Sequence, residues 1–162
     1  MDSSAISKII AALERKKLSG GGDGSVKKGK GSHAWEFAEG GNKNTICQGS
    51  GSVDGPSTTM CSYGAEANHL LAMLTLLQYF QSYIERKKKT IVTLYTDSQS
   101  VLDTLKDKSI YSVKTALKDH NDIIFQIKKC VQELRFDIVF EYVKAHQGRR
   151  QNLHQQKCSI YE

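Results

Sequence analysis

The sequence lacks any long apolar segment. No run approaches the roughly 20 apolar residues that a membrane-spanning helix needs, and the chain does not open with a charged and then apolar signal segment. These absences predict a protein without a membrane partner that resides inside the cell, in the cytoplasm or the nucleus.

Cysteine and proline are both scarce. The four cysteines are scattered, with no C-x-x-C pair, at Cys47, Cys61, Cys130 and Cys158. This spacing predicts reduced thiols rather than a disulfide framework or a sulfur-ligated zinc site. The single proline, Pro56, lies in a Ser/Thr/Gly-rich stretch from Ser50 to Ser62, which predicts a connection rather than a domain boundary.

The composition is that of one soluble globular domain with an excess of positive charge. The chain has 162 residues, of which 39% are hydrophobic and 25% charged, with a net charge of +6. Each basic cluster alone is typical of a solvated surface, but their recurrence favours a phosphate backbone as partner. The clusters are Arg15 to Lys17, Lys27 and Lys28 with Lys30, Arg86 to Lys89, Lys128 with Lys129, and Arg149 with Arg150.

A β-branched and apolar run from Thr90 to Thr96 ends in the carboxylate of Asp97. Both alternating sets of side chains include apolar ones, which predicts a central, parallel strand that is covered on both faces. Ligands of open α/β sheets bind beyond the carboxyl ends of such strands, so Asp97 is a candidate for chemistry. The structural alternative is that Asp97, like Ser98, caps a short helix from Gln99 to Leu105.

The longest helical pattern runs from about Ala65 to Glu85. Glu66 heads the apolar stripe that should face the sheet, which continues through Leu70, Met73, Leu77, Phe80 and Ile84. An acid in the first helical turn favours the helix dipole, but an unpaired charge on a buried stripe is expensive. Glu66 therefore needs a cation, either a metal ion or a lysine or arginine.

The remaining patterns complete a mixed α/β architecture. Asp23-Gly24-Ser25 has the composition of a turn, and His146 follows the last strand in a loop beside the predicted Asp97 strand. The other expected elements are a helix over 4–17, strands over 32–38 and 45–49 joined by a turn at 40–42, a helix over 121–134 and a strand over 136–143.

Four short motifs in this order carry a resemblance to a known family. They are Asp23-Gly24-Ser25, Tyr63-Gly64-Ala65-Glu66, Tyr95-Thr96-Asp97-Ser98 and Tyr142 to Gly148. Together they resemble the ribonuclease H family, and in particular the ribonuclease H domains of retrotransposons. The resemblance covers residues 18–148, with 1–17 as an accessory helix and 149–162 as a polar tail. A free-standing protein and part of a larger retroelement polyprotein both remain open.

The resemblance implies a fold and a chemistry. The fold would be a ribonuclease H-like α/β domain, a mixed five-stranded sheet of an antiparallel meander plus parallel strands, flanked by helices. Asp23, Glu66 and Asp97 would be catalytic and would bind two Mg²⁺ ions, for which Mn²⁺ could substitute. His146 would assist proton transfer or product release. The substrate would be the RNA strand of an RNA–DNA hybrid, sensed through its shape and 2′-hydroxyls.

Residues in and beside these motifs are expected to contact the nucleic acid. They are Ser25, Lys27, Lys28, Ser98, Gln99, Lys144 and Gln147.

The sequence departs from the family pattern in two places. The family adds a fourth acid after the histidine loop, but residues 148–161 contain no Asp or Glu. Gly20-Gly21-Gly22 stands where β-branched residues would be expected, and glycines weaken a strand. Two hypotheses follow, a metal-dependent endonuclease and a non-catalytic nucleic-acid-binding relic. A different nuclease or polynucleotidyl transferase of the same superfamily is a third.

Overall fold

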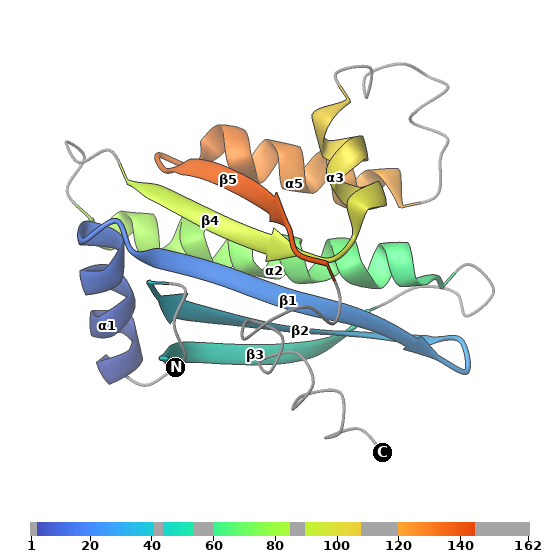
Figure 1. The fold of residues 1–162 in the computed structure, drawn as a ribbon, viewed down its shortest axis with the longest axis horizontal. Helices are drawn as coiled ribbons and strands as arrows, with labels where there is room; N and C mark the ends of the chain where they lie inside the picture. Colours follow the sequence, from blue (N-terminus) through green and yellow to red (C-terminus); the bar gives the residue numbers. More distant parts are fainter. Residues whose placement is uncertain (1–2, 41–43, 54–59, 85–89, 108–119, 145–162) are drawn as a thin grey trace.

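The computed structural model describes residues 3–40, 44–53, 60–84, 90–107 and 120–144. Figure 1 shows one twisted sheet with the long helix α2 lying along it. In chain order the elements are α1 (Ser3–Glu14), β1 (Leu18–Lys27), β2 (Lys30–Glu39), β3 (Thr45–Val53), α2 (Ser62–Phe80), the 3-10 turn η1 (Gln81–Tyr83), β4 (Ile91–Thr96), α3 (Gln99–Lys106), α5 (Asn121–Glu133) and β5 (Asp137–Tyr142).

The sheet has five strands in the order β3-β2-β1-β4-β5. The β1–β2 and β2–β3 pairs are antiparallel, whereas β4 pairs in parallel with both β1 and β5. The predicted mixed five-stranded α/β sheet is therefore confirmed. The central strand is β1 rather than β4, which lies between β1 and β5.

Strand β4 is fully buried on one face only. Val92 and Leu94 are 0% exposed, whereas Ile91 on the alternate face is 47% exposed. The prediction that both faces of this strand are covered is therefore wrong among the described residues. Its apolar alternation came from β-branched side chains that also suit a half-exposed pleated surface.

Two glycines of β1 let α2 pack closely on the sheet. A Cβ at Gly20 would lie 2.8 Å from the Met73 sulfur, and one at Gly22 would lie 2.7 Å from the His69 ring. Both contacts are too close for a side chain, so Gly20 and Gly22 make room for the helix along the strand. All three glycines of the run lie within β1.

Asp23-Gly24-Ser25 does not form a turn. All three residues lie within β1, and Asp23 is paired with Ala34 of β2. The chain reverses further on, at Lys28 and Gly29, whose φ angles are 52° and 74°. This two-residue hairpin loop uses left-handed backbone at both positions.

Helix α1 packs its apolar side into the core of the sheet domain. Ile9, Ala12 and Leu13 are 0% exposed and belong to the same buried cluster as α2 and β4. The helix ends at Glu14, before the predicted Lys17. The division of the chain into an accessory helix, a domain and a tail stays a prediction.

Other boundaries also move. Strand β3 continues to Val53 through four residues that were expected in the connection, because Ser50 to Val53 pair with β2. Helix α2 begins at Ser62 and ends at Phe80, where η1 follows. Pro56 and Cys158 lie outside the described residues. No helix in the described ranges is both long and apolar enough to cross a membrane.

Candidate metal and nucleic-acid site

Gly24 brings the start of α2 against β1. A Cβ at this position would lie 2.3 Å from the Ala65 carbonyl carbon and 2.3 Å from the Glu66 nitrogen. Only glycine, which has no Cβ, permits this approach of two backbones. As a result Glu66, which follows the first turn of the helix because α2 begins at Ser62 rather than at the expected Ala65, lies near Asp23 of the strand.

The parallel pairing of β1 and β4 brings Asp97 to the same level. The pairing of these strands ends with Gly21 and Tyr95, and Asp23 and Asp97 each follow two residues further along the chain. Neighbouring strands are about 4.8 Å apart. Three acids that are far apart in the sequence therefore lie near one another, toward the C-terminal ends of β1 and β4.

Both aspartates lie close enough to Glu66 to act on the pKa of its carboxyl. Burial raises the pKa of the Glu66 carboxyl above 4.5, a hydrogen bond with the Ser98 side chain opposes that rise, and the carboxylates of Asp97 and Asp23 raise it further. All three acids are half-buried, and Oδ1 of Asp97 is shielded from solvent. Like charges held this close disfavour ionisation, and a cation would relieve the repulsion.

The carboxylate oxygens of these three acids are the type of ligand that a hard divalent cation binds. Carboxylate oxygens are the ligands that Mg²⁺ and Mn²⁺ prefer. Within the described part of the chain, however, no three His, Cys, Asp or Glu side chains form a ready-made set of metal ligands. The three carboxylates converge but are not preassembled around an ion.

Ser98 connects the site to α3. It is the N-cap residue of that helix, yet its side chain makes no capping hydrogen bond. Instead its Oγ lies 3.2 Å from Ser100 Oγ, and its side chain hydrogen-bonds with Glu66. The expected capping by the Ser98 side chain is therefore wrong, and Asp97 precedes the cap position.

The predicted nucleic-acid contacts that the structure describes lie toward the C-terminal ends of β1, β4 and β5, which share one end of the sheet because these three strands are parallel. Lys27 and Lys28 are exposed at the β1–β2 hairpin, just beyond Ser25, whose Oγ lies 3.1 Å from Ser32 Oγ. Exposed Lys144 follows β5, whose pairing with β4 places it level with Ser98.

The Gln99 side chain contacts its own helix, and its predicted contact with nucleic acid stays a prediction. Its Nε2 donates to Asp103 Oδ1 at 2.8 Å within α3. His146 and Gln147 lie outside the described residues, as does the segment where the family places its fourth acid. Their predicted roles stay predictions.

Two contacts were missed from the sequence. His69 is 0% exposed under Gly22, and it could have been found, because it lies four residues from Met73 on the same side of the helix. Cys61 Sγ lies 3.2 Å from His120 Nε2, which links the starts of α2 and α5. These two residues are 59 positions apart, so no local pattern signals their contact.

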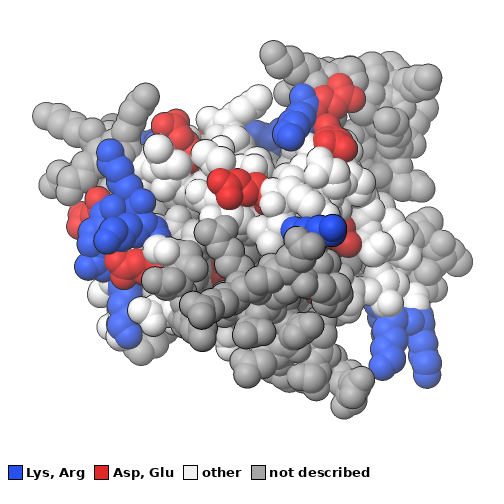
Figure 2. All heavy atoms as spheres, in the orientation of Figure 1, with Lys and Arg blue, Asp and Glu red and all other residues white. Residues whose placement is uncertain are grey.

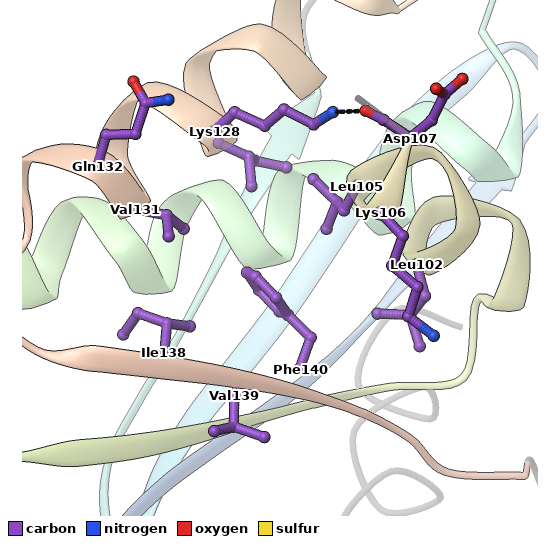
Figure 3. Close-up of a pocket in the computed structure, with 11 residues that line it drawn as sticks. Leu102, Leu105, Lys106, Asp107, Lys128, Val131, Gln132, Ile138, Val139 and Phe140 are labelled. Carbon is purple, nitrogen blue, oxygen red and sulfur yellow. Dashed lines mark hydrogen bonds between the residues drawn. The ribbon is translucent and has the colours of Figure 1, made fainter. Parts of the chain in front are cut away.

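A separate cleft of about 760 Å³ lies between α3, α5 and β5. Figure 3 shows Leu105, Val131, Ile138 and Phe140 around it, with Lys128 Nζ donating to the Asp107 carbonyl oxygen. Of the predicted catalytic and nucleic-acid residues that the structure describes, none lines this cleft. It is therefore distinct from the carboxylate site.

Solved structures with similar folds were found. The structure of LC11-RNase H1 in complex with an RNA/DNA hybrid has a TM-score of 0.62 at 17% identity, covering 90% of this chain and 100% of the other. The N-terminal RNase H domain of rv2228c from Mycobacterium tuberculosis, solved as a fusion with maltose binding protein, has a TM-score of 0.59 at 13% identity. This match covers 88% of this chain and 98% of the other. RNase H1 from the halophilic archaeon Halobacterium salinarum NRC-1 has a TM-score of 0.57 at 16% identity, and the match covers 78% of this chain and 85% of the other.

No protein-family model and no curated protein matches the sequence. The structural neighbours and the strand order define the fold of this chain as ribonuclease H-like. The likeness to retrotransposon domains stays a prediction.

Proposed function

We propose that this chain is a metal-dependent endonuclease that hydrolyses the RNA strand of RNA–DNA hybrids. The observation that carries the proposal is the approach of Glu66 on α2 to Asp23 of β1 and to Asp97 after β4. A cluster of like charges at the C-terminal end of a parallel strand is typical of a functional site. The bound hybrid in a neighbour of the same fold supports the choice of substrate.

Asp23, Glu66 and Asp97 would hold Mg²⁺ or Mn²⁺. When bound, two such ions would stabilise the attacking water and the leaving oxygen of a phosphodiester. Ser98 positions Glu66 through the hydrogen bond between their side chains. Ser25, Lys27, Lys28 and Lys144 would hold the hybrid along its backbone, with Gln99 and Gln147 beside it, and His146 would assist proton transfer or product release.

A second candidate function is hybrid binding without turnover, as in a relic of a retroelement domain. Two observations favour it. Residues 148–161 contain no acid, and the described residues contain no ready-made set of metal ligands. This candidate keeps the fold and the basic surface but removes the hydrolytic step.

Cleavage of a labelled RNA strand distinguishes the two functions. The purified chain is incubated with an RNA–DNA hybrid in Mg²⁺ or Mn²⁺, beside Asp97→Asn and beside double-stranded RNA as substrate. The enzyme proposal expects cleavage of the hybrid by the wild type and a loss of at least about 100-fold in Asp97→Asn. Equal, background-level cleavage by both proteins would leave only hybrid binding.

Binding without metal tests the second candidate. In EDTA, hybrid affinity should fall linearly on a logarithmic scale as salt rises, since phosphate contacts release counterions. A salt-independent affinity would count against both candidates.

A further inference from the structure

A second basic surface lies at the opposite end of β1 from the hairpin. It comprises exposed Lys8, Arg15, Lys16 and Lys17, called here the α1 cluster. Figure 2 shows Lys and Arg side chains gathered over α1 at one end of this face and over the β1–β2 hairpin at the other. Arg15 forms an ion pair with Glu39, with Nε 3.1 Å from Oε1. Lys8, Lys16 and Lys17 outnumber Glu14, the exposed acid of α1, so the α1 cluster has an excess of positive charge.

The backbone under the α1 cluster is fixed. The Lys17 N–H donates to the Ala12 carbonyl at 2.9 Å, and the Lys16 N–H donates to the Leu13 carbonyl at 3.0 Å. This pair of bonds is a Schellman motif, whose left-handed residue is usually glycine. Lys16 occupies that position with φ 58°.

The same substitution of lysine for a favoured residue occurs at the hairpin. Lys28 has φ 52° in a loop position where asparagine or glycine is preferred. Left-handed backbone is unfavourable for a side chain with a Cβ. Among the described residues, the non-glycine positions with positive φ are Lys16, Lys28 and His120, so two of the three are lysines of the two basic clusters. Strained positions that persist point to function.

We propose that the α1 cluster is a second anchor for the duplex, which binds the phosphate backbone at a point distant from the carboxylate site. The ligand, an RNA–DNA hybrid, rests on the proposed function. Lys17 and Lys27 are ten residues apart along β1, a distance of roughly 33 Å at about 3.3 Å per residue. At about 3.4 Å per base pair, only a duplex of about ten base pairs or more reaches both clusters, with the site at Asp23 between them.

The test compares Lys16→Gly with Lys129→Gln, which removes an exposed lysine on α5. Binding is measured in EDTA to hybrids of about 16 and about 6 base pairs, the shorter closed by a hairpin. On the longer hybrid Lys16→Gly should bind about threefold more weakly near 0.1 M salt, with a salt slope smaller by about 1. On the shorter hybrid its affinity should equal that of the wild type, whereas Lys28→Gly should weaken both.

Thermal unfolding separates this role from a structural one. Lys16→Gly should raise the Tm, because glycine fits the left-handed position better, so stability and affinity move in opposite directions. Lys16→Asn, which also tolerates this backbone, repeats the loss of charge. Affinity and slope equal to those of Lys129→Gln on the longer hybrid would overturn the proposal.

The outcome is separable from hybrid cleavage. If neither the wild type nor any variant cleaves the hybrid but Lys16→Gly still weakens binding to the longer hybrid, the anchor stands and the enzyme proposal fails. If the wild type cleaves and Lys16→Gly binds unchanged, the anchor fails alone.

Discussion

Glu66 is the residue whose surroundings say most about the site. It lies on the sheet-facing side of α2, half-buried, with the carboxylates of Asp23 and Asp97 near it and the Ser98 side chain as hydrogen-bond partner. A helix-capping acid would face solvent and would not need these neighbours. A bound cation would offset the negative charges that surround this side chain.

The raised pKa of Glu66 predicts how stability changes with pH. Between 4.5 and its raised pKa, the folded protein keeps a proton that the unfolded chain has released. The free energy of unfolding therefore falls as pH rises through this window. Urea denaturation in EDTA at several pH values should show this fall in the wild type and a flatter profile in Glu66→Gln. Glu14→Gln, on an exposed position of α1, should follow the wild type, and parallel profiles for all three proteins would contradict the assignment.

Divalent metal should reverse the loss of stability that repulsion among the three carboxylates causes. Without metal, Glu66→Gln should unfold at a Tm about 1–2 °C above the wild type, since screened repulsion between half-exposed charges is worth only a fraction of 1 kcal/mol. With Mg²⁺ in excess the wild type should gain stability by binding, and Glu66→Gln should gain much less. Differential scanning fluorimetry with and without EDTA measures both effects. Equal gains in the two proteins would place the metal elsewhere.

At the scale of elements, the contact between β1 and α2 sets the site. Gly24→Ala would put a Cβ against the backbone of Ala65 and Glu66. It should cost about 1–3 kcal/mol as an overpacked contact and should also weaken Mg²⁺ binding by moving Glu66. Chemical denaturation and metal titration measure the two losses.

Gly21→Ala is the matched control for Gly24→Ala. It lies in the same strand, but its added Cβ would meet only ordinary contacts, the nearest being Tyr95 Cβ at 3.7 Å. It should keep both stability and metal binding near the wild-type values. Similar losses in the two variants would show that the close approach of α2 is not what positions Glu66.

Helix α1 is expected to fold together with the sheet. Ile9 is 0% exposed within the common core, so Ile9→Ala should lower the free energy of unfolding by about 2–4 kcal/mol. Lys8→Ala, one residue earlier and exposed, should change it by less than about 0.5 kcal/mol. A single cooperative transition for Ile9→Ala with an unchanged midpoint would mean that α1 does not stabilise the domain.

At the scale of the whole molecule, much of the arrangement could be predicted from local patterns. The helical period placed Glu66 on the buried stripe, and the β-branched run placed Asp97 at the end of a strand. What local patterns could not show was how closely two backbones approach, so Gly24 and its neighbours were interpreted as a turn. The extension of β3 was missed for a similar reason, since Ser50 to Val53 is held by pairing with β2 rather than by its own propensity.

The whole-molecule charge distribution was predicted only in part. The sequence shows basic clusters, but only the fold puts Lys16 and Lys28 at opposite ends of one strand with the acids between them. This arrangement gives a polyanion two attractive regions beside a site that repels it until cations bind. Metal and nucleic acid should therefore bind cooperatively at the carboxylates.

The convergence of Asp23, Glu66 and Asp97 on divalent metal is tested most directly by titrating Mn²⁺ into the purified chain and counting bound ions by electron paramagnetic resonance. The wild type should bind Mn²⁺ saturably, with Mg²⁺ competing, and Asp97→Asn should lose most of that binding while remaining folded by circular dichroism. Saturable binding that is unchanged in Asp97→Asn, or no binding by the wild type at millimolar Mn²⁺, would contradict a metal site at these carboxylates.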